Sequence, residues 1–370
     1  MVTVSMPIYV TTGMMRRQYK SGKEDTELNS LLKAVNDCQV VSVVGTCKNA
    51  GKTTVLNYLL SHFDHCVNAV SSIGRDGESQ DVVTLTAKPD IYVKKGTLIA
   101  TAHNLLPCCT ITQEIVSTTP FNTPLGAIVI VRALSDGYIQ IAGPSQVQQM
   151  IQIKDMFIGL GAQRIFIDGA ISRLSPCTTA LSQATVLVTG ASYDIDIDRV
   201  VNHTAYITRL LTLNRVNSNI ANIIDARNRS IYSGSQNAIC LDSKGAIVEC
   251  DTYQAMYLPT EKLKYVYING ALTDKIISTA VKSPNNQQHK TIIVDDSSKI
   301  LINQSSYEYA MCRLINIEVI HDVNLALICT NPVSAYGYNF DANTFCVKVK
   351  QLCSNICDVP IIDVMRCINE

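Results

Sequence analysis

The chain has 370 residues, of which 31 are basic and 31 acidic, so its formal net charge is zero at pH 7. That balance excludes a whole-protein field that would attract nucleic acid or an anionic membrane, and it favours a small molecule or another protein as the partner. The length predicts two domains, and the absence of ~18 consecutive apolar residues and of an apolar leader predicts a soluble, cytoplasmic protein.

In chain order, residues 1–38 are expected to form an N-terminal extension that ends in a helix near residues 26–35. From residue 39, apolar strands alternate with helices, a pattern typical of a mainly parallel sheet covered on both faces. The expected strands of this first domain are 40–44, 67–73, 127–131, 164–167 and 184–188, with a further candidate at 138–142. Helices are expected at 145–160 and 196–211.

A polar, non-periodic stretch that begins at residue 214 marks the expected boundary between two domains, 39–213 and 214–370. The second domain is also predicted to be α/β. Its expected elements are a hairpin-like pair at 238–241 and 246–248, strands at 265–268, 291–294, 317–320, 325–329 and 360–364, and helices at 273–282, 306–314 and 341–356.

The most informative segment joins the first strand to the helix that follows it. It reads Gly45-Thr46-Cys47-Lys48-Asn49-Ala50-Gly51-Lys52-Thr53-Thr54. A phosphate-binding loop has the pattern G-x-x-x-x-G-K-[ST], and here Thr46 stands at the first position, with Gly45 one residue earlier. The alternative is a Gly-Lys-Thr triplet that only opens a helix.

The residue types of this loop suit a triphosphate and Mg²⁺. The N–H groups at a helix N-terminus, with the positive end of the helix dipole, provide fixed donors for phosphate oxygens. Gly51 allows close approach of the main chain, Lys52 is expected to reach the β- and γ-phosphates, and the Thr53 hydroxyl is expected to bind Mg²⁺. The other expected nucleotide contacts come from Gly45, Thr46, Lys48, Asn49, Ala50 and Thr54. The predicted fold is therefore α/β: a P-loop NTPase domain with a mainly parallel sheet, then a second α/β domain.

Two carboxylates are candidates for completing the site, because open α/β sheets bind ligands at the carboxyl ends of their strands. Asp168 ends one expected strand and Asp76 follows another. Both are assigned a catalytic role, together with Lys52, and a metal-binding role, together with Thr53, although an Asp that caps a turn would occupy the same position. Arg75 and Arg132 also follow strands, and they are candidates for neutralising γ-phosphate charge or for surface ion pairs.

Other motifs that would narrow the chemistry are missing from the sequence. No Asn-Lys-x-Asp segment follows the last strands, which favours ATP over GTP. The cysteines lack C-x₂-C pairs and the histidines lack H-x-x-x-H spacing, so buried thiols explain the cysteines better than a metal centre.

The loop 46–54 resembles the Lys-Asn-Ser-Gly-Lys-Thr-Thr loops of the P-loop class that includes the molybdopterin-guanine-dinucleotide accessory protein and dethiobiotin synthetase. The segment Ile167-Asp168-Gly169-Ala170 is similar to the acid-Gly segment of that class, with Asp168 where Glu is usual. This resemblance covers residues 39 to about 212. It implies that Lys52 and Thr53 hold phosphates and Mg²⁺, and nucleotide-sandwich homodimers are common in the class.

The whole chain also resembles P-loop reactivase subunits associated with adenosylcobalamin-dependent lysine and ornithine aminomutases. The segments that carry this resemblance are 132–137, 168–173 and 331–338. It implies a protein that works with a MutS-like ATPase and uses a nucleotide to drive exchange of damaged cobalamin on the mutase.

Three hypotheses about function follow from these features. The first is an NTPase that binds Mg-ATP and couples binding or hydrolysis to action on a protein partner. The second is an ATP-dependent small-molecule kinase or ligase, which would need a metabolite for turnover, whereas the first would show slow basal turnover raised by a protein. The third is an interaction protein with a decayed nucleotide site, which rests on Thr46 in place of the first glycine.

Overall fold

The computed structural model describes residues 32–73, 91–169, 177–230, 238–250, 255–256, 258, 262–282 and 290–363. These residues form a mixed α/β structure with a nine-stranded and a five-stranded sheet. None of the described helices is both long and apolar enough to cross a membrane. Of the expected N-terminal helix, residues 32–36 are described, and they are helical.

The nine-stranded sheet has the order β18-β17-β9-β1-β8-β2-β4-β6-β5. Its strands from β18 to β4 pair in parallel, and β6 and β5 extend it in antiparallel pairing. The strands are β1 (Val40–Gly45), β2 (Asn68–Ile73), β4 (Leu98–Ala102), β5 (Gln113–Thr123), β6 (Gly126–Ala133), β8 (Arg164–Gly169), β9 (Ala184–Gly190), β17 (Leu325–Asn331) and β18 (Ile361–Asp363). The sequence therefore predicts the mainly parallel character of this sheet correctly.

Strand β1 is buried on both faces because helices cover both sides of the sheet. Val41 and Val43 pack in the same core cluster as α2 (Lys52–His62). Val40 and Val44 point to the opposite face, which is covered by α3 (Val147–Gly159), α4 (Ile197–Leu211) and α9 (Ala342–Cys353). A run of β-branched residues suits a central parallel strand of this kind, since both faces must be apolar.

The five-stranded sheet has the order β11-β10-β12-β14-β16. Its strands are β10 (Ala238–Leu241), β11 (Ile247–Val248), β12 (Tyr265–Ile268), β14 (Lys290–Val294) and β16 (Ile315–Val319). The expected hairpin is present as the antiparallel pair of β10 and β11, while β12, β14 and β16 are parallel. Helices α7 (Asp274–Lys282) and α8 (Gln304–Cys312) pack on one face and α5 (Ser218–Ser230) on the other.

Small elements complete the two parts of the chain. Beside the nine-stranded sheet lie the 3-10 helix η1 (His103–Cys108) and the antiparallel pair of β3 (Ile91–Val93) with β7 (Gly137–Ile139). The expected strand at 138–142 therefore forms only in part, as residues 137–139, and it lies outside the main sheet. Near the five-stranded sheet, β13 (Leu272–Thr273) pairs with β15 (Ile300–Leu301), next to the 3-10 helix η3 (Ser297–Lys299).

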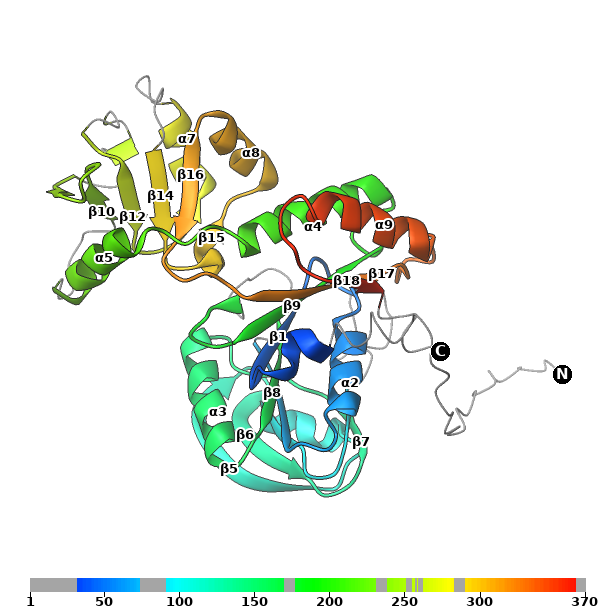
Figure 1. Cartoon of the computed structure of the whole chain (residues 1–370). Coiled ribbons are helices and arrows are strands. Elements are labelled where there is room, and N and C mark those ends of the chain that lie inside the picture. The colour runs from blue at the N-terminus through cyan, green and yellow to red at the C-terminus, as the bar shows by residue number, and fades with distance from the viewer. Residues whose placement is uncertain are drawn as a thin grey trace.

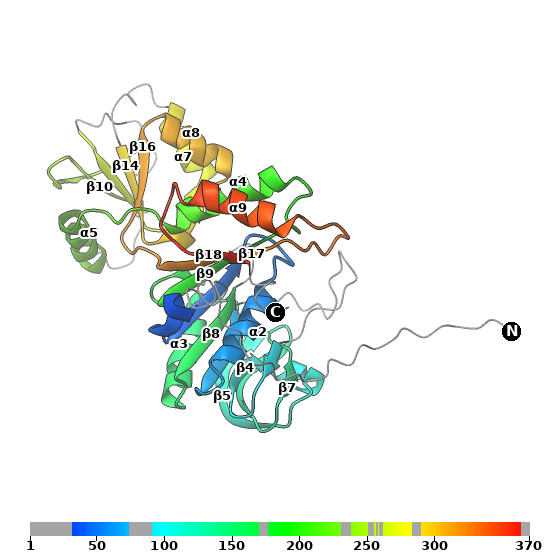
Figure 2. The same ribbon diagram turned by 45° about the vertical axis from the view of Figure 1, so that its right-hand side comes forward.

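The chain returns to the nine-stranded sheet after it has built the five-stranded one. Strands β17 and β18 lie beyond residue 214, yet β17 pairs with β9 and β18 pairs with β17. Helix α9, between them, packs on α4. Figures 1 and 2 show α4 and α9 side by side over the β17–β18 end of the larger sheet, with the five-stranded sheet at the upper left. Roughly residues 214–320 are therefore an insertion into the part of the chain that forms the nine-stranded sheet. The sequence had instead suggested a C-terminal domain that runs to residue 370.

A fragment that ends at residue 213 tests this arrangement. We expect it to lack the cooperative thermal unfolding of the whole chain, because β9 loses its partner β17 and the apolar face of α4 loses α9. Circular dichroism during heating measures this. A fragment that melts as cooperatively as the whole chain, and at the same temperature, would contradict the pairing of β17 with β9.

Candidate functional site

The candidate loop lies at the carboxyl edge of β1, in the centre of the larger sheet. Residues 46–51 connect β1 directly to α2. Asn49 and Gly51 have positive φ angles of 60° and 105°, which turn the chain back toward the sheet. Ala50 is completely buried, whereas the side chain of Lys48 faces solvent. The strand, loop and helix expected around the motif are therefore all present.

The side chain of Lys52 folds back over the end of β1. A Cβ atom placed on Gly45 would lie 3.1 Å from Cγ and 3.2 Å from Nζ of Lys52. Glycine at position 45 thus leaves room for the lysine to reach along the loop. At the N-terminus of α2, the capping residue Gly51 has no side chain and the first turn contains no acid. The amide donors of this turn therefore face no carboxylate of their own helix, which suits an anion.

Asp168 lies on β8, the strand next to β1. In the parallel register it is level with Val43 on one side and with Ser72 of β2 on the other. The carboxylate is therefore at the edge of the sheet where the loop begins, as the sequence predicted. Thr53 lies in the first turn of α2. The other acid, Asp76, and its neighbour Arg75 lie outside the residues that the structure describes.

Arg132 does not lie at this edge, and the prediction that it could serve the site is wrong. It sits near the end of β6, opposite Leu98 at the start of β4. Because β6 runs antiparallel to β4, its end lies at the amino edge of the parallel strands. The guanidinium there is 3.6 Å from the carboxylate of Glu114 on β5, so the surface ion pair is the observed role.

Gly190 and Asn331, on the other side of β1, are in close contact with the loop. A Cβ on Gly190, at the end of β9, would lie 2.8 Å from the carbonyl oxygen of Ala50. A Cβ on Gly51 would lie 2.9 Å from Nδ2 of Asn331, at the end of β17. Asn331 also shapes the turn that follows β17. Its Oδ1 accepts a hydrogen bond from the Val333 amide at 3.0 Å, which forms a turn, and its amide nitrogen faces the loop.

Thr46, which replaces the first glycine of the usual pattern, is a buried contact residue. Its amide donates to the carbonyl of Val188 at 2.9 Å, and its hydroxyl lies 3.3 Å from the hydroxyl of Thr189 on β9. The main chain of Thr46 also interacts with the ring of His203 on α4 and raises the pKa of this ring. No sequence signal identified His203 or Thr189, because their importance comes only from their position beside the loop.

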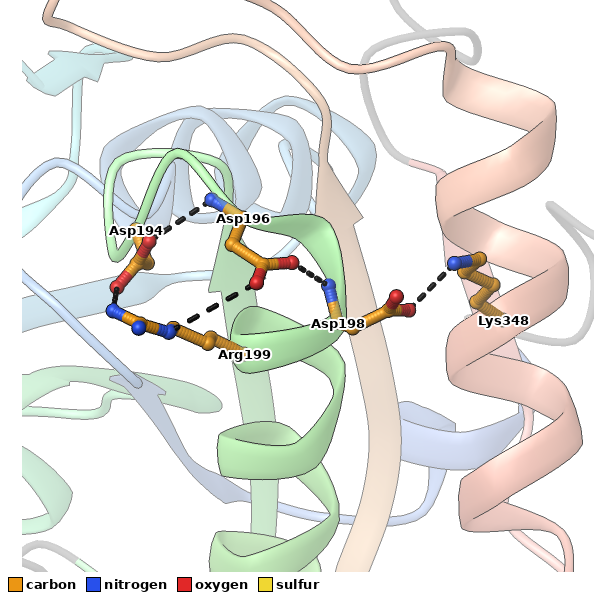
Figure 3. Close-up of polar contacts among 5 residues, drawn as sticks. All are labelled: Asp194, Asp196, Asp198, Arg199 and Lys348. Atoms are coloured by element: carbon orange, nitrogen blue, oxygen red, sulfur yellow. Dashed lines mark hydrogen bonds and ion pairs between the residues drawn. The ribbon is translucent and has the colours of Figure 1, made fainter.

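The connection from β9 to α4 is held in place by carboxylates, as Figure 3 shows. Asp194 accepts from the amide of Asp196, and Asp196 caps the helix by accepting from the amide of Asp198, both at 2.9 Å. Arg199 lies between Asp194 and Asp196, and Lys348 of α9 lies 2.5 Å from Asp198. The N-terminus of α4 is thus already satisfied by its own acids, in contrast to that of α2.

The cysteines give no evidence of a redox or metal centre in the described part of the chain. All cysteines there are free thiols. Burial raises the pKa of the Cys47 thiol in the loop to about 11, so this thiol is protonated at neutral pH. Within the described ranges, no group of three or more His, Cys, Asp or Glu side chains is arranged to hold a metal ion.

Comparison of the chain with family models, curated proteins and solved structures found no match. The arrangement around residues 45–54 combines uncapped amides, a lysine and a neighbouring carboxylate.

Replacing Gly51 with alanine tests the geometry of the loop. The positive φ angle alone should lower the free energy of unfolding by about 1–3 kcal/mol. Gly161→Ala is a matched control, because Gly161 has a φ angle of 90° and no described atom within 4 Å of an added Cβ. We expect Gly51→Ala to destabilise more than Gly161→Ala in urea denaturation, since only its Cβ meets Asn331. An equal or smaller effect would contradict the close contact.

Burial lowers the pKa of His203 from its ordinary value of 6.5, and the hydrogen bond to Thr46 offsets this in part. On acidification the unfolded chain therefore takes up this proton first, so stability is present above pH 6.5 and lost as the pH falls below it. We expect His203→Phe to flatten the loss of unfolding free energy between about pH 7.5 and pH 5. Chemical denaturation across that range measures it, and identical slopes for both proteins would contradict a lowered pKa of His203.

Proposed function

We propose that this protein is a P-loop NTPase that binds a Mg-nucleotide at residues 45–54. The observation that carries the proposal is the uncapped N-terminus of α2, with Lys52 folded over Gly45 on one side and Asp168 on the adjacent strand. Amide donors and a lysine suit the phosphates, and a lysine ammonium is a common phosphate ligand. Gly45, Thr46, Lys48, Asn49, Ala50, Gly51 and Thr54 would provide the remaining contacts.

The oxygen ligands near the loop fit Mg²⁺. The hydroxyl of Thr53 and the carboxylate of Asp168 are hard oxygen donors, and Mg²⁺ in nucleotide sites takes few protein ligands because phosphates and water supply the rest. When bound, the ion would neutralise charge on the phosphates. Asp76 stays a candidate second carboxylate. ATP is favoured over GTP because no Asn-Lys-x-Asp segment is present in the sequence.

We further propose that the nucleotide is coupled to a protein partner or a second copy of the chain. Exposed apolar side chains gather on the two loops beside the phosphate loop, namely Tyr193, Ile195, Val333 and Tyr336. The loops are joined, since the amide of Ala335 donates to the hydroxyl of Ser192 at 3.0 Å and Tyr338 donates to the carbonyl of Ala191 at 2.7 Å. Such a patch suits a protein contact. The resemblance to reactivase subunits suggests a cobalamin-dependent aminomutase as the partner.

Calorimetric titration with Mg-ATP, Mg-GTP and their non-hydrolysable analogues tests the nucleotide site. A hydrogen bond to a charged group contributes about 1.5–3 kcal/mol, so Lys52→Ala should weaken binding roughly 10- to 150-fold. Lys95→Ala is the control, because Lys95 precedes β4 and lies at the opposite edge of the sheet. The Lys95→Ala protein should bind the nucleotide with the affinity of the unmodified protein. No binding by the unmodified protein, or equal affinity of Lys52→Ala, would overturn the proposal.

A further inference from the structure

Helix α4 belongs to the hydrophobic cores of both parts of the molecule. Val201 and Ala205 pack with strands of the nine-stranded sheet and with α9. On a second face of the same helix, Tyr206 and Leu210 are part of the core under the five-stranded sheet. The helix has 15 residues and is therefore about 22 Å long. It begins at the edge that carries the phosphate loop and ends where the insertion starts.

At its first end, α4 is joined to the phosphate loop by a chain of buried hydroxyls. The Thr46 hydroxyl is 3.3 Å from that of Thr189, which is 2.6 Å from that of Thr204 on α4. Thr204 itself donates to the carbonyl of Val200 at 2.7 Å. Because each hydroxyl has one hydrogen, the chain can run in only one direction, from Thr46 to Thr189, to Thr204 and to Val200.

A second connection consists of aromatic rings. The ring of Tyr193 stacks on that of His203 with centroids 4.1 Å apart, and the main chain of Thr46 interacts with the His203 ring. The ring centroid of His203 is 6.2 Å from that of Tyr206. The ring centroid of Tyr206 is in turn 5.9 Å from that of Tyr307 on α8. The rings thus form a continuous packed row from the phosphate loop to the helix layer of the five-stranded sheet.

At its second end, α4 is also hydrogen-bonded to the insertion. The hydroxyl of Tyr206 donates to the carbonyl of Ile302 at 2.6 Å, and the hydroxyl of Ser297 donates to the carbonyl of Leu210. Packed cores have little free volume, so a small shift of a buried helix must be accommodated by the side chains around it. The insertion is therefore fastened to α4 itself as well as to the linkers around residues 214 and 320.

We propose that α4 transmits nucleotide binding from the phosphate loop to the five-stranded sheet, with Thr46, Thr204 and His203 as the positioning residues. This inference rests on the proposed function. A phosphate on the loop amides reorients the segment that includes Thr46, and the hydroxyl chain and the stacked ring of His203 pass that change to the helix. Consider a ligand of the insertion whose affinity depends on the position of α4. By linkage, this ligand changes the affinity for the nucleotide by the same factor by which the nucleotide changes the affinity for the ligand.

A single tryptophan is the reporter for the test, because the chain contains none. Tyr307→Trp places it at the end of the ring row, where the native side chain is 8% exposed. Tyr309→Trp is the matched control on the same helix, where the native side chain is 50% exposed. We expect a non-hydrolysable Mg-ATP analogue to change the tryptophan emission of Tyr307→Trp and to leave that of Tyr309→Trp unchanged. The dissociation constant from the emission change should equal the one from calorimetry.

The positioning residues are then tested in the Tyr307→Trp background. Thr204→Val and His203→Phe should each reduce the emission change at saturating nucleotide by at least half, whereas Thr204→Ser, which keeps the hydroxyl, should retain it. A purely structural role would alter stability without altering this response. Hydrogen exchange of the unmodified protein provides a second measurement, with nucleotide-dependent protection expected over residues 290–320.

The outcomes separate this inference from the proposed function. Nucleotide binding by calorimetry with unchanged emission and unchanged hydrogen exchange overturns the coupling alone. A full emission change in both Thr204→Val and His203→Phe overturns the roles of those two residues. No nucleotide binding by the unmodified protein overturns the proposed function and the coupling together.

Discussion

The candidate site depends on the parallel pairing of β1 with β8 on one side and with β9 on the other. In a parallel sheet all carboxyl ends lie at one edge, so residues far apart in the sequence meet there. This pairing brings Asp168 to one side of the loop and Gly190 to the other. Strand β17, paired with β9, adds Asn331 to the same edge. The N-terminus of α2 is thus surrounded by ends of strands.

Close packing around the loop depends on glycines at three positions. Gly45 leaves space for Lys52, Gly51 lies against Asn331, and Gly190 lies against Ala50. At each of these places a Cβ would come within about 3 Å of another atom, which a native core does not tolerate without a shift. The loop is therefore in close contact with its neighbours on both sides, so that a shift of the loop must be accommodated by these neighbours.

The insertion of the five-stranded sheet between α4 and β17 makes the two parts of the molecule depend on one another. A domain joined only by linkers moves freely unless its interface is large and apolar. Here Tyr206 and Leu210 of α4 are buried in the core of the insertion, while other residues of the same helix are buried against the larger sheet. Movement of the insertion therefore requires movement of α4.

The sequence by itself determined the local features: the strand-loop-helix around Gly51 and Lys52, the position of Asp168 at a strand end, and the α/β character of both parts. These follow from periodicity and turn residues, which act over a few neighbouring positions. Tertiary structure alone decided that β17 and β18 join the first sheet, since an apolar strand looks the same whichever sheet it enters. It also decided that Arg132 lies at the opposite edge, because that depends on β6 running antiparallel, and that Thr46 contacts α4 through Thr189 and His203. The pairing of β17 with β9 and the contact of Thr46 with Thr189 join residues more than a hundred positions apart, and no local pattern encodes which distant partner a side chain meets.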